Sequence, residues 1–301
     1  MNTKQLKYVL ILAREGTFSK AAEELNITQP SLSQYIKKIE NEIGLELFDR
    51  TNGEVRLTDA GRVYLEAGRK ILDLEHQMEV SFSDISAYKT GSLIIGAAPY
   101  RTASMMPEIA CAFKDIHPGM HLVVREGTTA ELAEGMEHGE YDLCLTLLPL
   151  DGRIFAWEKV VEEELILAVP ASMPLLDTNE IPNRKYPAVN AEALNHQNMV
   201  MLTDAQYMQK QLMSLAAEYH LTIQTAVVVK SLEAQIAMVR AGVGMALMPS
   251  GIERFCVPSE VTFYSFVQPL PKRELVVMWR KDRKLSKAAQ ELKDIIRGIA
   301  W

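Results

Sequence analysis

The stretch FSKAAEELNITQPSLS, residues 18–33, decides how the N-terminal part of this chain folds. Ala22 and Leu25 fall at helical spacing on one face, and Asn26 is a residue type that can end a helix in the left-handed conformation. Thr28 then supplies a side-chain oxygen that can cap the first N–H groups of a new helix. The pattern predicts two helices joined by a tight turn, with the second helix beginning just after Thr28.

The second predicted helix has one apolar and one polar face. Leu32, Ile36, Ile39 and Ile43 form a stripe that we expect to face the core. Polar side chains on a helix that lies in the major groove can bond base edges and phosphates, so the opposite face is a candidate DNA-reading surface. Its candidate contacts are Gln29, Pro30, Ser31, Ser33, Gln34 and Lys37. Lys37 could instead be an ordinary solvated charge.

The segment after this helix carries a hairpin signal. Asn52-Gly53 lies between two short predicted strands, residues 47–50 and 54–57, and this dipeptide favours a tight turn between strands. A hairpin beside a DNA-reading helix is a wing, and Arg50 and Arg56 would suit the phosphates that flank the groove. Arg50 could instead pair with a neighbouring carboxylate.

These residues, taken in order, resemble the LysR-type transcriptional regulator family. The matching segments are Gly16-Thr17-Phe18-Ser19, Ala21-Ala22, Leu25 to Ser33, Ile36 with Glu40, Gly44 to Phe48, Arg50, and Leu57-Thr58-Asp59-Ala60-Gly61. Tyr35 departs from the family pattern, because the family usually has a smaller polar residue after the position of Gln34. This departure concerns base preference and leaves the resemblance intact.

The resemblance implies a mixed fold: an N-terminal winged helix-turn-helix, a long linker helix, and a two-lobed α/β domain like the periplasmic solute-binding proteins. It also implies the partners, which are double-stranded promoter DNA, a small-molecule effector, further copies of the chain in a homotetramer, and RNA polymerase. The expected function is therefore a regulator that binds promoter DNA and responds to an effector.

The residues after Thr58 predict a long helix with a dimer seam. No proline interrupts the chain between Thr58 and Gly91. Apolar and small residues recur along this segment at heptad spacing: Tyr64, Ile71, Met78 and Ile85, with Ala67, Leu74 and Ser81 between them. A single helix folded onto its own head is the alternative. We favour pairing with a second chain, because so long an amphipathic helix exceeds what a small head can cover.

From Gly91 onward, strands and helices alternate in the pattern of a doubly wound α/β domain. The expected domains are a DNA-binding head at 1–58, a linker helix at 59–90, and an effector-binding domain at 91–301. Lobe I of the last domain should comprise about 91–163 and 268–301, and lobe II about 164–267.

Hydroxyl-rich turns follow the predicted strands of the two lobes, where ligands bind in open α/β sheets. The candidate effector contacts are Arg101, Thr102, Ser104, Thr128, Thr129, Thr203 and Ser231. Arg101 offers a fixed fork of donors that suits a carboxylate, so a small anionic effector is expected. Each Thr or Ser could instead cap its own helix.

Charge is unevenly distributed along the chain. The formal net charge is −7, but residues 1–70 contain 11 Lys and Arg against 10 Asp and Glu. This segment is therefore +1 and the remainder −8, which places the acidity away from the DNA-reading head. No apolar run approaches a membrane span, and the three cysteines suit a reducing compartment, so we expect a cytoplasmic protein without a membrane partner.

The sequence contains no pattern typical of catalysis or metal binding. His117, His121 and His138 lie near predicted turns without a matched nucleophile, and we interpret them as surface histidines. Of the cysteines, Cys256 is the one we expect to be exposed. No cofactor, metal or enzyme activity is therefore expected. The alternative hypothesis is a solute-binding protein or enzyme of the two-lobed fold that carries an accessory DNA-binding head.

Overall fold

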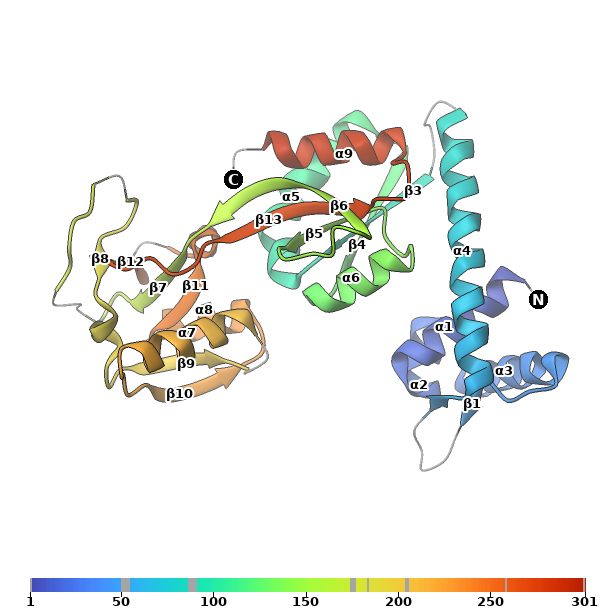
Figure 1. Ribbon diagram of the computed structural model, residues 1–301, viewed down its shortest axis with the longest axis horizontal. Helices are drawn as coiled ribbons and strands as arrows, with labels where there is room; N and C mark the ends of the chain where they lie inside the picture. The colour runs from blue at the N-terminus through green and yellow to red at the C-terminus, as the bar shows by residue number, and fades with distance from the viewer. Residues whose placement is uncertain are drawn as a thin grey trace. The chain divides into compact units, whose positions relative to one another are not determined.

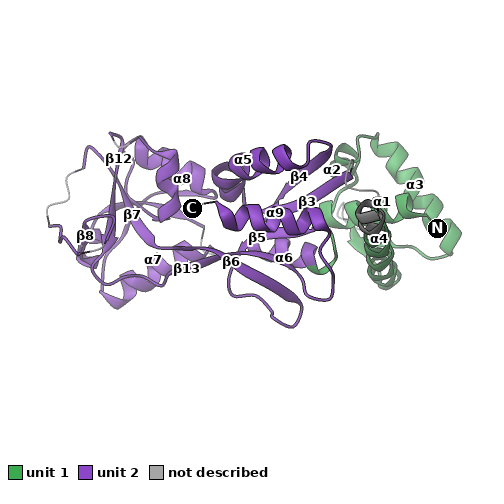
Figure 2. Ribbon diagram, turned by 90° about the horizontal axis from the view of Figure 1, so that it is seen from above, with its two compact units in different colours: residues 1–89, 137–140 green, residues 90–136, 141–301 purple. Residues whose placement is uncertain are grey.

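A computed structural model describes residues 2–49, 55–85, 91–173, 177–182, 184–203, 206–257, 259–299 and 301 (Figure 1). The chain forms two compact units (Figure 2). Unit 1 is Met1–Lys89 with Glu137–Glu140, and unit 2 is Thr90–Met136 with Tyr141–Trp301. The head and the long helix that follows it therefore belong to one unit, and both lobes of the α/β part belong to the other.

Short-range capping signals set the helices of the head. Its elements are α1 (Thr3–Glu15), α2 (Phe18–Glu24), α3 (Gln29–Ile43), β1 (Phe48–Asp49) and β2 (Arg56–Leu57). Asn26 has a φ of 52°, which confirms the predicted left-handed turn between α2 and α3. Thr28 caps α3 as predicted, since its Oγ1 accepts the backbone N–H of Ser31 at 3.4 Å.

The core of the head lies between its three helices. Leu32, Ile36 and Ile39 of α3 are buried against α1 and α2, as the apolar stripe predicted. The prediction for Ile43 was wrong, because its side chain is 40% exposed. Ile43 is the final residue of α3, and the last turn of this helix extends beyond the cluster that the core residues form.

The two strands of the wing pair antiparallel, with Phe48 opposite Leu57 and Asp49 opposite Arg56. Phe48 is buried in the head's core, so the hairpin is anchored at its base. The predicted tip at Asn52-Gly53, and with it Arg50, lies outside the described residues.

A single long helix, α4 (Asp59–Ile85), follows the wing. Near its start, Tyr64 and Leu65 pack against the head's core. Farther along, Leu74 is 59% and Met78 57% exposed, so these two residues of the predicted seam have no apolar cover within unit 1. Among the described helices, none combines the length and the apolar character that crossing a membrane requires.

Lobe I of unit 2 is a five-stranded sheet with helices on its faces (Figure 1). It contains β3 (Gly91–Ala97), α5 (Pro99–Ile116), β4 (Met120–Glu126), α6 (Thr129–Glu137), β5 (Leu143–Leu147), β6 (Phe155–Glu163), β13 (Arg273–Arg280) and α9 (Lys287–Gly298). The strand order is β4-β3-β5-β13-β6. β3 is parallel to β4 and β5, whereas β13 runs antiparallel to β5 and β6.

Lobe II differs from lobe I in how its strands pair. It contains β7 (Leu165–Pro170), β8 (Ala188–Val189), η2 (Ala191–Leu194), β9 (Asn198–Leu202), α7 (Tyr207–Glu218), β10 (Gln224–Val229), α8 (Leu232–Arg240), β11 (Ala246–Pro249), η3 (Ser250–Phe255) and β12 (Val261–Phe266). β9 and β10 are parallel, but β7 is antiparallel to both β11 and β12. The antiparallel pairing around β7 therefore departs from the mostly parallel pattern of a doubly wound α/β domain.

Two strands carry the chain between the lobes. β6 ends at Glu163, and β7 of lobe II begins at Leu165, while β13 returns the chain to lobe I from Arg273 onward. β6 and β13 lie side by side and pair antiparallel, with Arg273 opposite Glu163 (Figure 1). Glu163 and Arg273 therefore mark the hinge between the lobes.

Candidate nucleic-acid interface and effector site

The polar face of α3 is open to solvent. Gln29, Pro30, Gln34 and Lys37 are exposed, and Ser31 and Ser33 are partly exposed. The Ser31 hydroxyl also shares a hydrogen bond of 2.8 Å with Thr28 Oγ1, so it belongs to the cap at the start of the helix. The capped first turn and the apolar stripe below hold this face in a fixed orientation on the head, as a groove-reading helix requires.

Tyr35 lies on the flank of α3 that touches α1. Its ring contacts the ring of Tyr8 edge-on, with centroids 5.2 Å apart. The Nζ of Lys4 lies 5.9 Å from the Tyr35 centroid and 5.7 Å from that of Tyr8. Tyr35 is 43% exposed, so the large side chain that departs from the family pattern is anchored by α1 while one side of it faces solvent.

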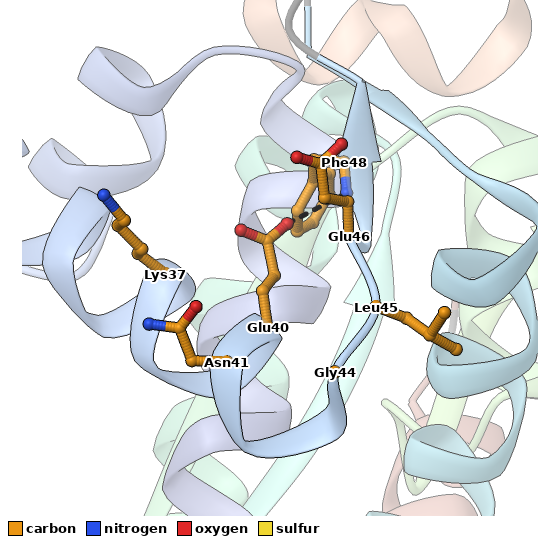
Figure 3. Close-up of a pocket in the computed structure, with 7 residues that line it drawn as sticks. All are labelled: Lys37, Glu40, Asn41, Gly44, Leu45, Glu46 and Phe48. Atoms are coloured by element: carbon orange, nitrogen blue, oxygen red, sulfur yellow. Dashed lines mark hydrogen bonds between the residues drawn. The ribbon is translucent and has the colours of Figure 1, made fainter.

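Glu40 links α3 to the base of the wing, a role that the sequence reasoning missed. Its Oε1 accepts the backbone N–H of Leu47 at 2.9 Å and that of Phe48 at 3.2 Å. In Figure 3, the Glu40 side chain points from α3 toward Phe48, and Lys37 and Asn41 stand on the same helix beside it. A glutamate on the inward face of α3, one turn after Ile36, was the signal that could have revealed this contact.

The wing is also fastened to α4. Thr58 Oγ1 donates to the carbonyl of Glu46 at 2.6 Å and accepts the Gly61 N–H at 3.0 Å. At Gly61, a Cβ would lie only 2.1 Å from the carbonyl oxygen of Leu47, so glycine is required for this close approach. Arg56 is exposed on β2, where it projects from a wing held by both α3 and α4.

Several predicted effector residues bond within their own turns. Thr128 and Glu131 form a reciprocal cap on α6, since Glu131 N donates to Thr128 Oγ1 at 3.3 Å and Thr128 N donates to Glu131 Oε2 at 2.7 Å. Ser231 caps α8 by accepting the Ala234 N–H at 3.1 Å. Thr203 Oγ1 accepts Gln206 Nε2 at 3.3 Å. The contacts of Thr128 and Ser231 match the capping alternative, whereas Thr203 bonds the Gln206 side chain. Effector contact by all three residues stays a prediction.

Ser104 and Thr146 have buried hydroxyls without a partner in the described part of the chain. Ser104 lies in the second turn of α5, whose N-cap Ala98 offers no side-chain cap. Two residues earlier, Thr102 Oγ1 donates to the Ala98 carbonyl at 3.4 Å. Thr146 was missed by the sequence reasoning, and its signal was a lone hydroxyl near the end of the apolar strand β5.

The donor fork of Arg101, which was expected to suit an effector carboxylate, bonds a carboxylate of the chain itself in the structure. Arg101 is 5% exposed, and its Nη1 donates to Glu163 Oε1 at 2.7 Å, while its Nη2 bonds Glu163 Oε2. Arg273 Nη2 donates to the same Oε2 at 3.0 Å. The carboxylate that fits the Arg101 fork is therefore supplied by the hinge of the chain itself, 62 residues away.

The three hinge side chains form a buried cluster with a formal charge of +1. Burial alone would raise the pKa of Glu163, but Arg101 and Arg273 outweigh it and hold this pKa below its ordinary value. Burial lowers the pKa of Arg273, and its Nε has no hydrogen-bond partner among the described residues. Two guanidinium groups thus share one carboxylate in a buried site.

The exposure of the cysteines differs from the prediction. Cys111 is exposed, whereas Cys256 is partly buried and Cys144 is buried. Burial raises the pKa of Cys256 to about 11, and burial likewise raises the pKa of Cys144. Cys111 follows Ala110 on an outward-facing side of α5, and α5 covers the sheet with its opposite face, which residue spacing alone did not reveal.

His117 is likewise not the surface histidine that was expected. It is 7% exposed, its Nε2 lies 2.6 Å from Glu291 Oε2, and its ring stacks 4.8 Å from that of Phe113. His117 ends α5 and Glu291 lies on α9, so the pair joins the two helices on this face of lobe I. Packing of α5 against α9 buries it.

A head with an exposed polar helix and an anchored wing, followed by a long helix and a two-lobed α/β domain, defines the class of transcriptional regulators that carry their own sensor domain. Residues 3–62 match the family described as "Bacterial regulatory helix-turn-helix protein, lysR family", and residues 86–300 match "LysR substrate binding domain". The chain belongs to the LysR family and is a DNA-binding transcriptional regulator.

Curated relatives match over nearly the whole chain. The DNA-binding transcriptional dual regulator OxyR of Escherichia coli (strain K12) is 26% identical over 303 residues, which cover 99% of this chain and 95% of the relative. The uncharacterized HTH-type transcriptional regulator YcgK of Bacillus subtilis (strain 168) is 28% identical over 307 residues, covering 99% of this chain and 94% of the relative. These similar proteins are named as regulators.

Solved structures share the fold. The full-length CbnR complexed with its target DNA has a TM-score of 0.64 at 21% identity and covers 100% of both chains. A full-length OxyR variant from Pseudomonas aeruginosa has a TM-score of 0.64 at 24% identity, covering 99% of this chain and 95% of the other. The expected fold class, a winged head followed by a two-lobed α/β domain, is confirmed.

Proposed function

We propose that this regulator senses a small anionic, carboxylate-like effector that binds at the first turns of α5. The observation that carries the proposal is the buried hinge cluster, in which Arg101 and Arg273 share the single carboxylate of Glu163 among the described residues. An uncompensated buried charge is unfavourable, and an anion nearby would offset it. The N-terminus of α5, which has no side-chain cap at Ala98, carries a partial positive charge that favours the same anion.

Two buried hydroxyls are added to the proposed site, Ser104 in the second turn of α5 and Thr146 on β5. An unsatisfied buried hydroxyl costs about 1–3 kcal/mol, so a ligand oxygen that bonds Ser104 or Thr146 would gain from their present lack of partners. Thr102 belongs to the same turn as Arg101, and we include it in the proposed site. The remaining proposed contacts are Thr128, Thr129, Thr203 and Ser231.

For the DNA interface, we infer that α3 reads bases and the wing contacts phosphates. The exposure of Gln29 and Gln34 supports base reading by α3, and the exposed charges of Lys37 and Arg56 support phosphate contacts. The structural relative CbnR was solved with its target DNA, which favours the same use of the head here. A second copy of the chain would pair with the first along α4. The DNA-bound protein would also contact RNA polymerase.

DNA recognition is tested with the duplex upstream of this protein's own gene and a scrambled duplex of equal length. Across a salt series, we expect tight binding to the upstream duplex with a steep salt dependence, because phosphate contacts release counterions. Equal and weak binding to both duplexes would show that the upstream duplex is not a target of this protein. Replacing Gln29 by Ala should then reduce the difference between the duplexes.

The effector proposal is tested by thermal shift with a panel of small carboxylates. Carboxylates that raise the Tm of the wild type should lose most of this shift in Ser104→Ala and in Thr146→Val. Ser265→Ala is the matched control, since Ser265 also has a buried hydroxyl without a partner among the described residues but lies on β12 of lobe II. An equal loss in the control, or neutral analogues that bind as well, would contradict the proposed site.

A further inference from the structure

Tyr100 belongs to lobe I by sequence but packs in the core of lobe II. It is the second residue of α5, and it is only 4% exposed. Its buried apolar neighbours come from lobe II and include Ile166, Met248 and Ile252. Its ring also lies 5.9 Å from that of Phe255 in η3. The first turn of α5 is therefore inserted into the opposite lobe.

The fit of Tyr100 against η3 leaves no spare space. A Cβ placed on Gly251 would lie 2.7 Å from Tyr100 Oη and 3.3 Å from Glu163 Oε1. The Tyr100 hydroxyl is buried, and the described residues give it no hydrogen-bond partner. The contact between Tyr100 and Gly251 is therefore steric packing. The hydroxyl end of Tyr100 occupies the volume that a side chain at position 251 would need.

The next residue along α5 binds the hinge. Arg101 forms its two-pronged contact with Glu163, the last residue of β6, and Glu163 is opposite Arg273, the first residue of β13. The Arg101 guanidinium also lies over the Tyr100 ring at 4.7 Å from its centroid. Tyr100 and Arg101 therefore connect α5 to η3 of lobe II and to β6 and β13, the two strands that join the lobes.

We propose that Tyr100 and Arg101 form an interlobe latch, in which Tyr100 seated on Gly251 and Arg101 bonded to Glu163 fix the angle between the lobes. Both are positioning residues, because they act by holding the first turns of α5. The regulatory part rests on the proposed function: an effector bound beside Ser104 would act by favouring a different seating of this latch. The latch itself requires no ligand.

The seating of Tyr100 is tested by a suppressor pair in the full-length protein without DNA or ligand. Gly251→Ala should lower the Tm by several degrees, because the added methyl group overlaps the tyrosine oxygen. Tyr100→Phe alone should leave the Tm near the wild-type value, since it removes an oxygen that has no partner in the described structure. The double variant Tyr100→Phe with Gly251→Ala should regain most of the loss.

Gly298→Ala is the matched control, because a Cβ at Gly298 meets no atom within 4 Å. A Gly251→Ala variant as stable as this control would overturn the latch. So would a double variant that is no more stable than Gly251→Ala alone. Because these measurements use neither DNA nor effector, they stand whether or not the upstream duplex proves to be a target.

The regulatory part is tested by footprinting the ligand-free protein on the upstream duplex. Gly251→Ala should alter the protected pattern at saturating protein, and the double variant should restore the wild-type pattern. If Gly251→Ala leaves the footprint unaltered although Tyr100→Phe restores its Tm, the regulatory role of the latch is overturned. The packing of Tyr100 on Gly251 would still be supported in that case. Failure of the wild type to prefer this duplex would instead count against its use as a target and leave the Tm result unchanged.

Discussion

Glu163 shows how one buried carboxylate organises its surroundings. It is 3% exposed and holds the guanidinium groups of two arginines from different elements, one in α5 and one in β13. Breaking a buried pair leaves an uncompensated charge, whereas an exposed pair contributes little because water screens it. The hinge should therefore be far more sensitive to loss of Glu163 than to loss of its exposed neighbour Glu162.

Glu163→Gln should destabilise unit 2 by about 3 kcal/mol, because it leaves Arg101 and Arg273 without their counter-charge. The folded pKa of Glu163 is lowered, so its contribution is fully present above the unfolded value and is lost as pH falls through the folded value. The stability difference between wild type and variant should thus shrink below about pH 4.5. Urea unfolding across a pH series measures it.

The control for this series is Glu162→Gln, whose carboxylate pairs with Lys159 and Lys272 on the surface. It should change stability little at any pH. If Glu163→Gln behaves like the control, or if its deficit persists unchanged in acid, the charged cluster does not stabilise the hinge.

The thiols should differ in reactivity in the order of their exposure. Cys111 should react first with a disulfide reagent at pH 8, Cys256 more slowly because its pKa is raised to about 11, and Cys144 only on unfolding. Reagent titration of the wild type and of Cys111→Ser and Cys256→Ser measures the order. Faster labelling of Cys256 than of Cys111 would contradict it.

Helix α3 carries residues suited to two kinds of DNA contact, base reading and phosphate binding, at different positions along its length. Its first turn carries Gln29, which can bond a base edge, and Lys37 follows two turns later with a charge suited to phosphate. Glu40 and Tyr35 fix the rest of the helix, the first by bonding the base of the wing and the second by packing on α1.

Replacing Gln29 by Ala should weaken the preferred duplex by about 1–3 kcal/mol and relax preference at one base position. Lys37→Ala should weaken all duplexes alike and reduce the salt slope by about 1. Competition binding with single-base variants of the duplex distinguishes the two. The assignment fails if Lys37→Ala changes base preference or if Gln29→Ala weakens every sequence equally.

At the scale of the whole molecule, α4 leaves apolar surface that unit 1 does not cover. Val63, Leu74 and Met78 are 70%, 59% and 57% exposed, and they fall on one side of the helix at helical spacing. A chain that carries such a stripe can bury it by pairing with a second copy, which would also place two DNA-reading helices on one duplex.

Leu74→Glu combined with Met78→Glu should shift the protein toward monomer and weaken binding to the upstream duplex, because two buried like charges per helix would oppose pairing. Sedimentation equilibrium measures the assembly. Arg62→Ala, an exposed change on another side of α4, is the control and should leave the assembly unaltered. A double variant that assembles like wild type would show that another surface joins the copies.

The fold of the head could be predicted from the sequence, because the signals that form its helices and turns act within a few residues. Thr28 caps the turn beside it, Asn26 takes the left-handed conformation, and the stripe that contains Leu32 and Ile36 is buried by helical period alone. The alternation of strands and helices likewise predicted an α/β domain, and the family matches confirm that class.

Contacts between residues far apart in the chain depend on tertiary packing, and the sequence did not predict them. Arg101 was expected to face an effector, but the carboxylate that fits it belongs to Glu163, and the choice depends on how α5 packs against the hinge strands. For the same reason, no local pattern indicated that Tyr100 would enter lobe II or that Cys111 would face solvent. Capping and helical period are properties of neighbouring residues, whereas partners separated by many residues are selected by packing.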